Sequence, residues 1–534
     1  MVTVGTTYDV ASAAAERDIP DALQERFCVR QEARPARVVT YHDTFDWRLH
    51  ADGGTLRSTP ARGATRVTWS SYDGELRHRL RVGELGVFAW DFPPGPFREA
   101  LARVIEMRRL LPIVEIEHGG WMLHILDREE KTVARVACER GTAAGPGEAA
   151  SPSPLPVTLR TLPVRGYDKA HRRLTRFLEN ELGLAPCERD ELTVALAAIG
   201  RTPGSYSSKL RLRLDPAMRA DEAMVTICRT LLETMLSNED GTRRDLDSEF
   251  LHDFRVAGRR TRSALSQIKQ VFPPRVVTHF RREFSWLGTV TGPTRDLDVY
   301  LLKMDDYKAA LPEVVQKDLA PLEAFLRARQ RREQRRLVEA LDSERYRELI
   351  RSWRAFLDQG VPATAAPANA GRPIRELAAE RIWRACGRVL KKGKAAVGEA
   401  PAEALHALRI DCKKLRYLLE FFRSLFDPAE LGRLIKALKS LQDNLGDFND
   451  LEIQQHTLKE FARQMQEEGR APIETLMAMG RLIAGLESRQ AEEKQRFAEC
   501  FTRFSQQDNR TSFRRLFASL PDSTSNRPDF KDEH

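Results

Sequence analysis

The 534-residue sequence has no long apolar run and only seven cysteines. A membrane-spanning helix needs about 18 or more consecutive apolar residues, and no such stretch occurs. Residues 1–18 carry acids and lack the cationic start and apolar stretch of a secretion signal, so we expect no export. The cysteines are odd in number and form no Cys-x-x-Cys pair, which argues against a disulfide framework and a zinc ribbon. These absences are typical of a cytoplasmic protein.

Aromatic residues make up only 7% of the chain and are not interleaved with its basic clusters. The basic clusters therefore lack aromatic side chains on which nucleic-acid bases could stack, and no RNP, KH or zinc-finger pattern occurs. Charge of one sign does not dominate either, because 86 Lys+Arg face 77 Asp+Glu and the formal net charge is +9. The composition disfavours a nucleic-acid partner, although a nucleic-acid-binding or scaffold protein stays an alternative.

Two regions of different periodicity follow one another along the chain. Up to about residue 165, short runs of β-branched and polar residues alternate with turn signals, which predicts an α+β domain over residues 20–202. From about residue 220, apolar residues recur with the helical period, which predicts an all-α domain over residues 215–507. We therefore expect a multidomain protein, with residues 508–534 as a flexible tail.

The helical region contains an internal repeat. Residues 359–373, rich in Pro, Gly and Ala, are predicted to link repeat 1, about residues 220–358, to repeat 2, about residues 374–507. At a constant offset of 154 residues, the segment LHDFRV that starts at Leu251 lies over the segment LHALRI that starts at Leu405. Each copy offers about four helices, which is the size of a four-helix bundle.

Each repeat carries a helix with a basic stripe beside its apolar face. At about 100° per residue, cations three and four positions apart fall on one side of a helix. Like charges at this spacing repel one another by a few tenths of a kcal/mol, so a duplicated stripe predicts an anionic ligand. A solvated cationic face is the alternative, and each histidine is either a packing residue or a ligand contact. The stripe consists of His252, Arg255, Arg259 and Arg262 in repeat 1, and of His406, Arg409, Lys413 and Arg416 in repeat 2.

A short acidic segment follows a glycine in each repeat. Residues 295–298 (RDLD) follow Gly292, and residues 449–452 (NDLE) follow Gly446. We expect each segment to begin a helix, where Asp stabilises the free backbone N–H groups. The carboxylates can also pair with the basic stripe and hold it in place.

The repeated pattern Leu-His-x-Leu/Phe-Arg-Val/Ile-x-x-Arg/Lys-Arg/Lys-x-Arg, followed by the acidic segment, resembles the CHAD family, the conserved-histidine α-helical domain. The resemblance covers about residues 220–507 and implies two four-helix bundles related by pseudo-twofold symmetry. It also implies that basic residues bind inorganic polyphosphate, whose phosphates suit the guanidinium fork, and that the protein is associated with polyphosphate granules. The predicted polyphosphate-binding residues are His252, Arg255, Arg259, Arg260, Arg262, Lys269, Arg327, Arg335, His406, Arg409, Lys413, Lys414, Arg416, Arg423, Arg481 and Arg489.

The first region is similar to the CYTH family, whose triphosphate-tunnel fold is a mostly antiparallel, barrel-like sheet. Residues 41–49 (YHDTFDWRL) are similar to the family's Tyr-Phe-Asp-Thr-Pro-Asp-x-Arg-Leu segment, and residues 54–57 (GTLR) to the Gly-x-x-Leu-Arg that follows it. The resemblance puts an opening Glu-x-Glu-x-Lys strand near residues 22–30 and a late Glu-x-Glu strand near residues 135–139. Each of these places retains only one acid.

Hydrolysis of a triphosphate needs a divalent metal ion held between carboxylates. Because these carboxylates are reduced, we expect a degenerate CYTH-like domain with no catalytic residues, no metal ligands and no cofactor. Glu115 and Glu117, which alternation puts on one face of a strand, are the candidates to replace them. The leading prediction is a non-catalytic polyphosphate-binding protein, either monomeric or oligomeric. The enzyme alternative is a metal-dependent triphosphatase or polyphosphatase.

Overall fold

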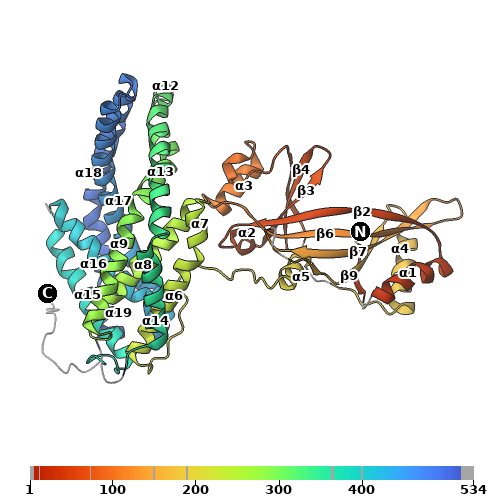
Figure 1. Cartoon of the computed structure of the whole chain (residues 1–534), viewed down its shortest axis with the longest axis horizontal. Helices are drawn as coiled ribbons and strands as arrows, with labels where there is room; N and C mark the ends of the chain where they lie inside the picture. Colours follow the sequence, from red (N-terminus) through yellow and green to blue (C-terminus); the bar gives the residue numbers. More distant parts are fainter. Residues whose placement is uncertain are drawn as a thin grey trace. The chain divides into compact units, whose positions relative to one another are not determined.

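The chain forms two compact units, Met1–Ser207 and Ser208–His534. The computed structural model describes residues 5–10, 13–72, 74–147, 151–187, 190–362, 366–398 and 401–518. Figure 1 shows the first unit as a sheet with short helices and the second as long helices. The predicted multidomain layout, an antiparallel sheet domain followed by a mostly helical region, is therefore confirmed.

The first unit is built on one antiparallel sheet. Its strand order is β1-β9-β7-β6-β2-β3-β4-β5, with β8 paired to β7. The strands are β1 (Thr7–Val10), β2 (Cys28–Asp43), β3 (Gly54–Ala61), β4 (Ala64–Ser71), β5 (Leu76–Val82), β6 (Leu111–Leu126), β7 (Thr132–Ala144), β8 (Ser153–Pro154) and β9 (Val157–Pro163). The helices are α1 (Ala13–Arg26), α2 (Arg48–Ala51), α3 (Pro96–Ile105), α4 (Asp168–Arg176) and α5 (Glu191–Ala198).

The longest strands, β2 and β6, pair along their whole length. Their register shifts between Arg34 and Arg37, where Pro35 has no N–H to donate to the ladder. Alternation along β6 buries Ile116 and His118 and leaves the residues between and before them exposed.

The predicted start of this domain at residue 20 is too late. Strand β1 pairs with β9, with Tyr8 opposite Leu159, and both side chains are fully buried. A strand of four residues is too short to show period-two alternation in the sequence. The predicted strand near residues 22–30 is also wrong in part, because α1 continues to Arg26 before β2 begins at Cys28.

The second unit is mostly helical, and residues 208–219 lead into its first long helix as an irregular segment. The helices of the first half are α6 (Ala220–Ser237), α7 (Glu239–Arg243), α8 (Ser248–Gln267), α9 (Pro274–Val290), α10 (Gly292–Leu302), α11 (Met304–Ala309), α12 (Glu313–Gln316), α13 (Ala320–Leu341) and α14 (Glu344–Gln359). Those of the second half are α15 (Ile374–Ala396), α16 (Ala402–Phe421), α17 (Pro428–Glu467), α18 (Ile473–Phe504) and α19 (Gln507–Phe517).

Three pairs of helices begin at the offset of the sequence repeat. Helix α6 begins at Ala220 and α15 at Ile374, α8 at Ser248 and α16 at Ala402, and α9 at Pro274 and α17 at Pro428. Each second member starts 154 residues after the first, and α8 and α16 are both 20 residues long.

The acidic segments lie differently in the two halves. Helix α10 begins at Gly292, as expected, but Gly446 lies inside the 40-residue helix α17, so the predicted helix start there is wrong. In the first half, Pro293 follows the glycine, and a proline has no N–H for a continuous helical ladder. The second half has Asp447 at this position, and the helix continues through it.

The two buried clusters of the second unit each draw on both halves of the sequence. The larger cluster contains Phe254 and Trp353 of the first half and Leu415 of the second. The smaller one contains Phe325 of α13 and Leu482 of α18. Because neither core is confined to one repeat, the halves are packed together through shared apolar side chains. The predicted pair of bundles with pseudo-twofold symmetry stays a prediction.

The predicted flexible tail is wrong for its first part. Residues 507–517 form α19, which buries Phe513 and Phe517. The rings of Phe426 and Phe517 lie 4.8 Å apart, centroid to centroid. Phenylalanines four positions apart share one face of a helix and anchor it. The remainder of the tail, from residue 519, lies outside the described residues.

Neither a membrane-spanning helix nor a disulfide occurs among the described residues. Among the described helices, none has the length and hydropathy of a membrane span. All seven cysteines lie within the described ranges and are free thiols.

Candidate functional site

Helix α8 positions the first basic stripe. Asp247 caps the helix, because its carboxylate accepts hydrogen bonds from two backbone N–H groups of the first turn. Phe254 and Leu265 are buried in the core on one side. Arg259 and Arg262 are exposed on the other side.

Helix α16 positions the second stripe in the same way. Leu408, Leu415 and Leu419 are fully buried on its core side. Arg409 and Lys413 consequently lie at the half-buried edge of the helix.

Helices α8, α16 and α17 line a cavity of about 610 Å³ within the second unit. Six of the predicted residues line it, three from each repeat. We call this space the basic cavity. Its basic lining consists of His252, Arg259, Arg260, Arg409, Lys413 and Arg416, together with Lys209.

Hydrogen bonds join α8 to α16 at this cavity. Arg259 Nε donates to the Tyr417 hydroxyl at 2.9 Å, and Arg260 Nη2 donates to Glu420 Oε2 at 2.7 Å. Arg416 Nε donates to the other oxygen of Glu420, also at 2.7 Å. Two of these bonds connect α8 with α16, and the cations of both repeats line one space.

The cavity has an acidic wall on α17. Asp443, Asp447 and Asp450 follow one face of this helix and line the cavity. Arg409 Nη2 donates to Asp450 Oδ1 at 2.9 Å, which confirms for repeat 2 the expected pairing of the acidic segment with the stripe. Burial and the neighbouring carboxylates raise the pKa of Asp447 above its usual value.

The positive charges that line the cavity change the pKa of Lys413. Burial, together with Arg409 and Arg259, lowers the pKa of its ammonium group to about 8. Both causes disfavour the charged form of a lysine. A bound anion would remove the repulsion and favour the charge again.

A second, smaller cavity of about 360 Å³ lies between α8 and α9. Arg255, Arg259 and Arg262 line it. Arg255 Nη1 donates to the carbonyl oxygen of Gly288 at 2.9 Å and to Thr291 Oγ1 at 2.7 Å. Arg255 is therefore held by the C-terminal turn of α9, where a cation is favourable, and burial lowers its pKa.

The other predicted residues are not brought into either cavity. Arg327 pairs with Glu323 at 2.7 Å, and Lys414 lies 3.5 Å from Asp411 on its own helix. His406 Nδ1 shares a 2.7 Å hydrogen bond with Asn449 Oδ1. The predicted residues that line neither cavity are Lys269, Arg327, Arg335, His406, Lys414, Arg423, Arg481 and Arg489.

Sequence reasoning missed the polar partners of the stripes. Glu420 follows Arg416 by four residues, a spacing that predicts an ion pair within the helix, but its second partner is 160 residues away. Asp443 and Asp447 are separated by four residues, so an acidic face on α17 could have been read from the sequence.

The first unit contains a separate cavity of about 440 Å³. Arg37, Arg57 and Arg160 line it together with Glu139, which is the one acid in residues 135–139. Glu115 and Glu117 are exposed on the face of β6 opposite to buried residues and do not line this cavity. Strand β1, which was not predicted, contributes Thr7 and Asp9.

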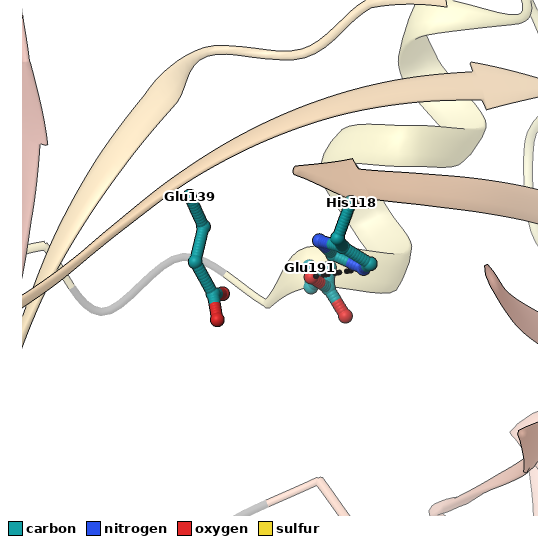
Figure 2. A group of neighbouring side chains, drawn as sticks. All are labelled: His118, Glu139 and Glu191. Atoms are coloured by element: carbon teal, nitrogen blue, oxygen red, sulfur yellow. Dashed lines mark ion pairs between the residues drawn. The ribbon is translucent and has the colours of Figure 1, made fainter. Parts of the chain in front are cut away.

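Three side chains that could ligate a metal meet in this cavity. Figure 2 shows His118, Glu139 and Glu191, with the ion pair between His118 and Glu191. Burial lowers the pKa of His118 against the opposing effect of Glu191. Burial alone would raise the pKa of Glu139, but Arg37 and Arg34 outweigh it and hold that pKa below its usual value.

Comparison with known proteins gives a family match for the second unit. The family model of the CHAD domain matches residues 226–459, a range that contains all of α8 and α16. Two uncharacterized proteins, from two strains of Mycobacterium tuberculosis, are each 27% identical over 284 residues, which are 49% of this chain and 51% of the relative. The chain thus spans about half the length of the curated relatives it matches.

Two solved structures are similar in part. The CHAD domain from the plant Ricinus communis is 28% identical, with a TM-score of 0.45, over 58% of this chain and 96% of that one. PptA from Streptomyces chartreusis is 17% identical, with a TM-score of 0.43, over 53% of this chain and 100% of that one. The resemblance of the first unit to a CYTH domain stays a prediction. On the family match, residues 226–459 of the chain are a CHAD domain.

Proposed function

We propose that the second unit binds inorganic polyphosphate in the basic cavity. The observation that carries the proposal is that six basic side chains from two helices, α8 and α16, line one space. The resemblance of the sequence to the CHAD family, with the match at residues 226–459, supports polyphosphate as the anion.

A linear polyanion suits this arrangement better than a small anion does. The cations lie along two helices joined by the Arg259–Tyr417 and Arg260–Glu420 hydrogen bonds, so they form two lines of positive charge. Arginine donates in a fork that matches two phosphate oxygens, and Lys413 supplies a point charge. Successive phosphates can therefore contact cations of both helices.

The acidic wall on α17 sets a limit on the affinity. Asp450 competes with phosphate for Arg409, since their side chains are already paired at 2.9 Å. Binding must then come from several phosphates at once, and a longer chain should bind more tightly than a short one. Each phosphate that is neutralised releases counterions, so the affinity should also fall with rising salt.

The test is a titration of the full chain with end-labelled polyphosphate of graded length, followed by fluorescence polarisation at two salt concentrations. We expect the double variant Arg409→Ala/Lys413→Ala to lose at least about 100-fold in affinity, since each lost charge-assisted contact contributes about 1.5–3 kcal/mol. The matched control Arg347→Ala/Arg503→Ala removes two exposed cations that pair on their own helices. It should bind as the parent protein does.

If both double variants lost the same affinity, binding would depend on net charge alone, and this result would contradict the proposed cavity. Competition separates polyphosphate from nucleic acid. If RNA at the same phosphate concentration displaces long polyphosphate, the chain is a nucleic-acid-binding protein instead. Association with polyphosphate granules in the cytoplasm belongs to the same proposal, and co-purification of the tagged chain with granules tests it.

A further inference from the structure

We propose that the first unit holds a divalent transition-metal ion between His118 of β6, Glu139 of β7 and Glu191 of α5. One ligand atom of each residue lies within 4.8 Å of the others. Metal–ligand bonds of about 2.0–2.2 Å put ligand atoms about 3–4 Å apart, so small side-chain rotations close the site. This inference is independent of polyphosphate binding by the second unit.

The sheet positions two of the ligands. Strands β6 and β7 are antiparallel neighbours, with His118 opposite Gly141 and Gly120 opposite Glu139. The two side chains are thus two residues out of register on adjacent strands, and both line the same cavity. Glu191 is the first residue of α5, and Asp190 caps this helix by accepting a hydrogen bond from the Thr193 N–H.

The buried Nε2 atom of His118 supports the presence of a metal ligand site. Its side chain is 5% exposed, and its Nε2 atom has no hydrogen-bond partner among the described residues. This nitrogen lies 3.3 Å from Glu191 Oε1. A buried polar atom without a hydrogen bond is costly, and a metal ion between nitrogen and carboxylate satisfies both.

A neighbouring side chain outside the proposed ligand set holds one oxygen of each carboxylate. The Tyr41 hydroxyl donates to Glu191 Oε2 at 2.6 Å, and Glu191 Oε1 faces His118. Arg34 and Arg37 both donate to Glu139 Oε1. Groups that bind the outer oxygen of a ligating carboxylate orient it and adjust the affinity for the metal.

The chemistry of the ligands selects the class of metal. An imidazole with two carboxylates suits Zn²⁺, Mn²⁺, Co²⁺ or Fe²⁺, whereas Mg²⁺ and Ca²⁺ prefer oxygen ligands only. Three protein ligands leave at least one coordination position for water or an anion. Four acids line the cavity, namely Asp9, Glu139, Asp190 and Glu191, and they balance its three arginines and the neighbouring Arg34, which binds Glu139.

The experiment uses the full chain, freed of metal with a chelator and then titrated with Co²⁺ and, separately, Mg²⁺. We expect one Co²⁺ per chain with a visible d–d absorption band, and Mg²⁺ binding weaker by about 100-fold or more. His118→Ala should lower the Co²⁺ affinity by about 10-fold or more and remove the band. His124→Ala is the matched control, since His124 lies on the same strand 3.1 Å from Glu32 but outside the cavity.

Glu191→Gln provides a second variant in case His118→Ala does not fold. It retains an oxygen that accepts the Tyr41 hydrogen bond, and it should weaken Co²⁺ binding to a similar degree. No Co²⁺ binding by the parent chain, or unchanged binding in Glu191→Gln, overturns the inference. A thiolate charge-transfer band that persists in His118→Ala also overturns it, because the metal would then be held by cysteine.

Discussion

Arg260 of α8 donates a 2.7 Å hydrogen bond to Glu420 of α16, which lies 160 residues further along the chain. Both side chains are largely buried, at 12% and 19% exposure. The other oxygen of Glu420 accepts from Arg416. One carboxylate thus connects α8 to α16 and neutralises part of the charge of two arginines that line the basic cavity.

Replacing this carboxylate should destabilise the second unit. Glu420→Ala leaves Arg260 largely buried without its partner, and the cost of breaking a fully buried pair is about 3–5 kcal/mol. Because the pair is partly exposed, we expect a loss of about 2 kcal/mol in the free energy of unfolding. Urea unfolding followed by far-UV circular dichroism measures it.

Glu344→Ala is the control for Glu420→Ala. Glu344 pairs with Arg347 and Arg351 at 68% exposure, and exposed pairs contribute about 0–1 kcal/mol. A double-mutant cycle between Arg260→Ala and Glu420→Ala should give a coupling energy of about 1 kcal/mol or more. A coupling energy near zero would show that the two residues do not stabilise each other.

The basic stripes are predictable from the sequence because they depend on local order alone. Helical periodicity puts Arg259 on the same side as His252, and the offset of the repeat transfers this face to Arg409 and Lys413. The structure brings these side chains together in one cavity. The stripe alone does not predict the hydrogen bond between Arg255 and the end of α9, since this contact depends on how the two helices pack.

The partners of the stripes depend on tertiary contacts. Glu420 meets Arg260 only because α8 and α16 are packed side by side, and no local pattern records that packing. In the first unit, the sequence pattern of β6 predicts only that His118 points inward like every second residue of the strand. Its neighbours Glu139 and Glu191 come from an adjacent strand and a distant helix, so sequence spacing does not connect them.

The affinity for polyphosphate should fall as the pH rises above about 8. The pKa of Lys413 is lowered to about 8 by burial, Arg409 and Arg259, and bound phosphate raises it again. Binding above pH 8 therefore takes up a proton, and a difference of one pKa unit corresponds to about tenfold in affinity. Polarisation titrations at constant ionic strength from pH 7 to 9.5 should show a loss of about tenfold.

Lys413→Arg should flatten this pH profile, because a guanidinium group keeps its charge over the whole range. Lys414→Arg is the matched control, since Lys414 lies outside the basic cavity, and it should retain the parent profile. If Lys413→Arg follows the parent profile, another group is responsible for the proton uptake.

Removing Asp450 should strengthen polyphosphate binding. Asp450→Asn abolishes a charge on the acidic wall and weakens the competition for Arg409. We expect the affinity to rise about three- to tenfold at low salt and less at high salt, where charges are screened. Asp358→Asn, which removes an exposed partner of Arg229 outside the cavity, should change little. A lower affinity of Asp450→Asn would mean that Asp450 orients Arg409 for the ligand.

Asp298, in the acidic segment of repeat 1, should make the second unit less stable at high pH. Its side chain is 6% exposed, and burial together with Asp245 raises its pKa to about 7. The folded state therefore binds a proton that the unfolded state releases above about pH 4, so the stability from this group falls as the pH rises from about 4 to 7. Asp298→Asn keeps an oxygen for the 3.1 Å hydrogen bond from Gln330 and has no charge to bury.

The difference in unfolding free energy between Asp298→Asn and the parent should consequently shift by about 2 kcal/mol in favour of the variant between pH 5 and pH 8. Urea unfolding of both proteins at the two pH values measures this difference, and the effects of all other titrating groups cancel in it. Parallel stability profiles would show that Asp298 ionises at its ordinary pKa. In that case, water or a rearranged Gln330 must solvate the carboxylate, and the buried environment of α10 and α13 would be looser than the packing of Leu297 and Phe325 implies.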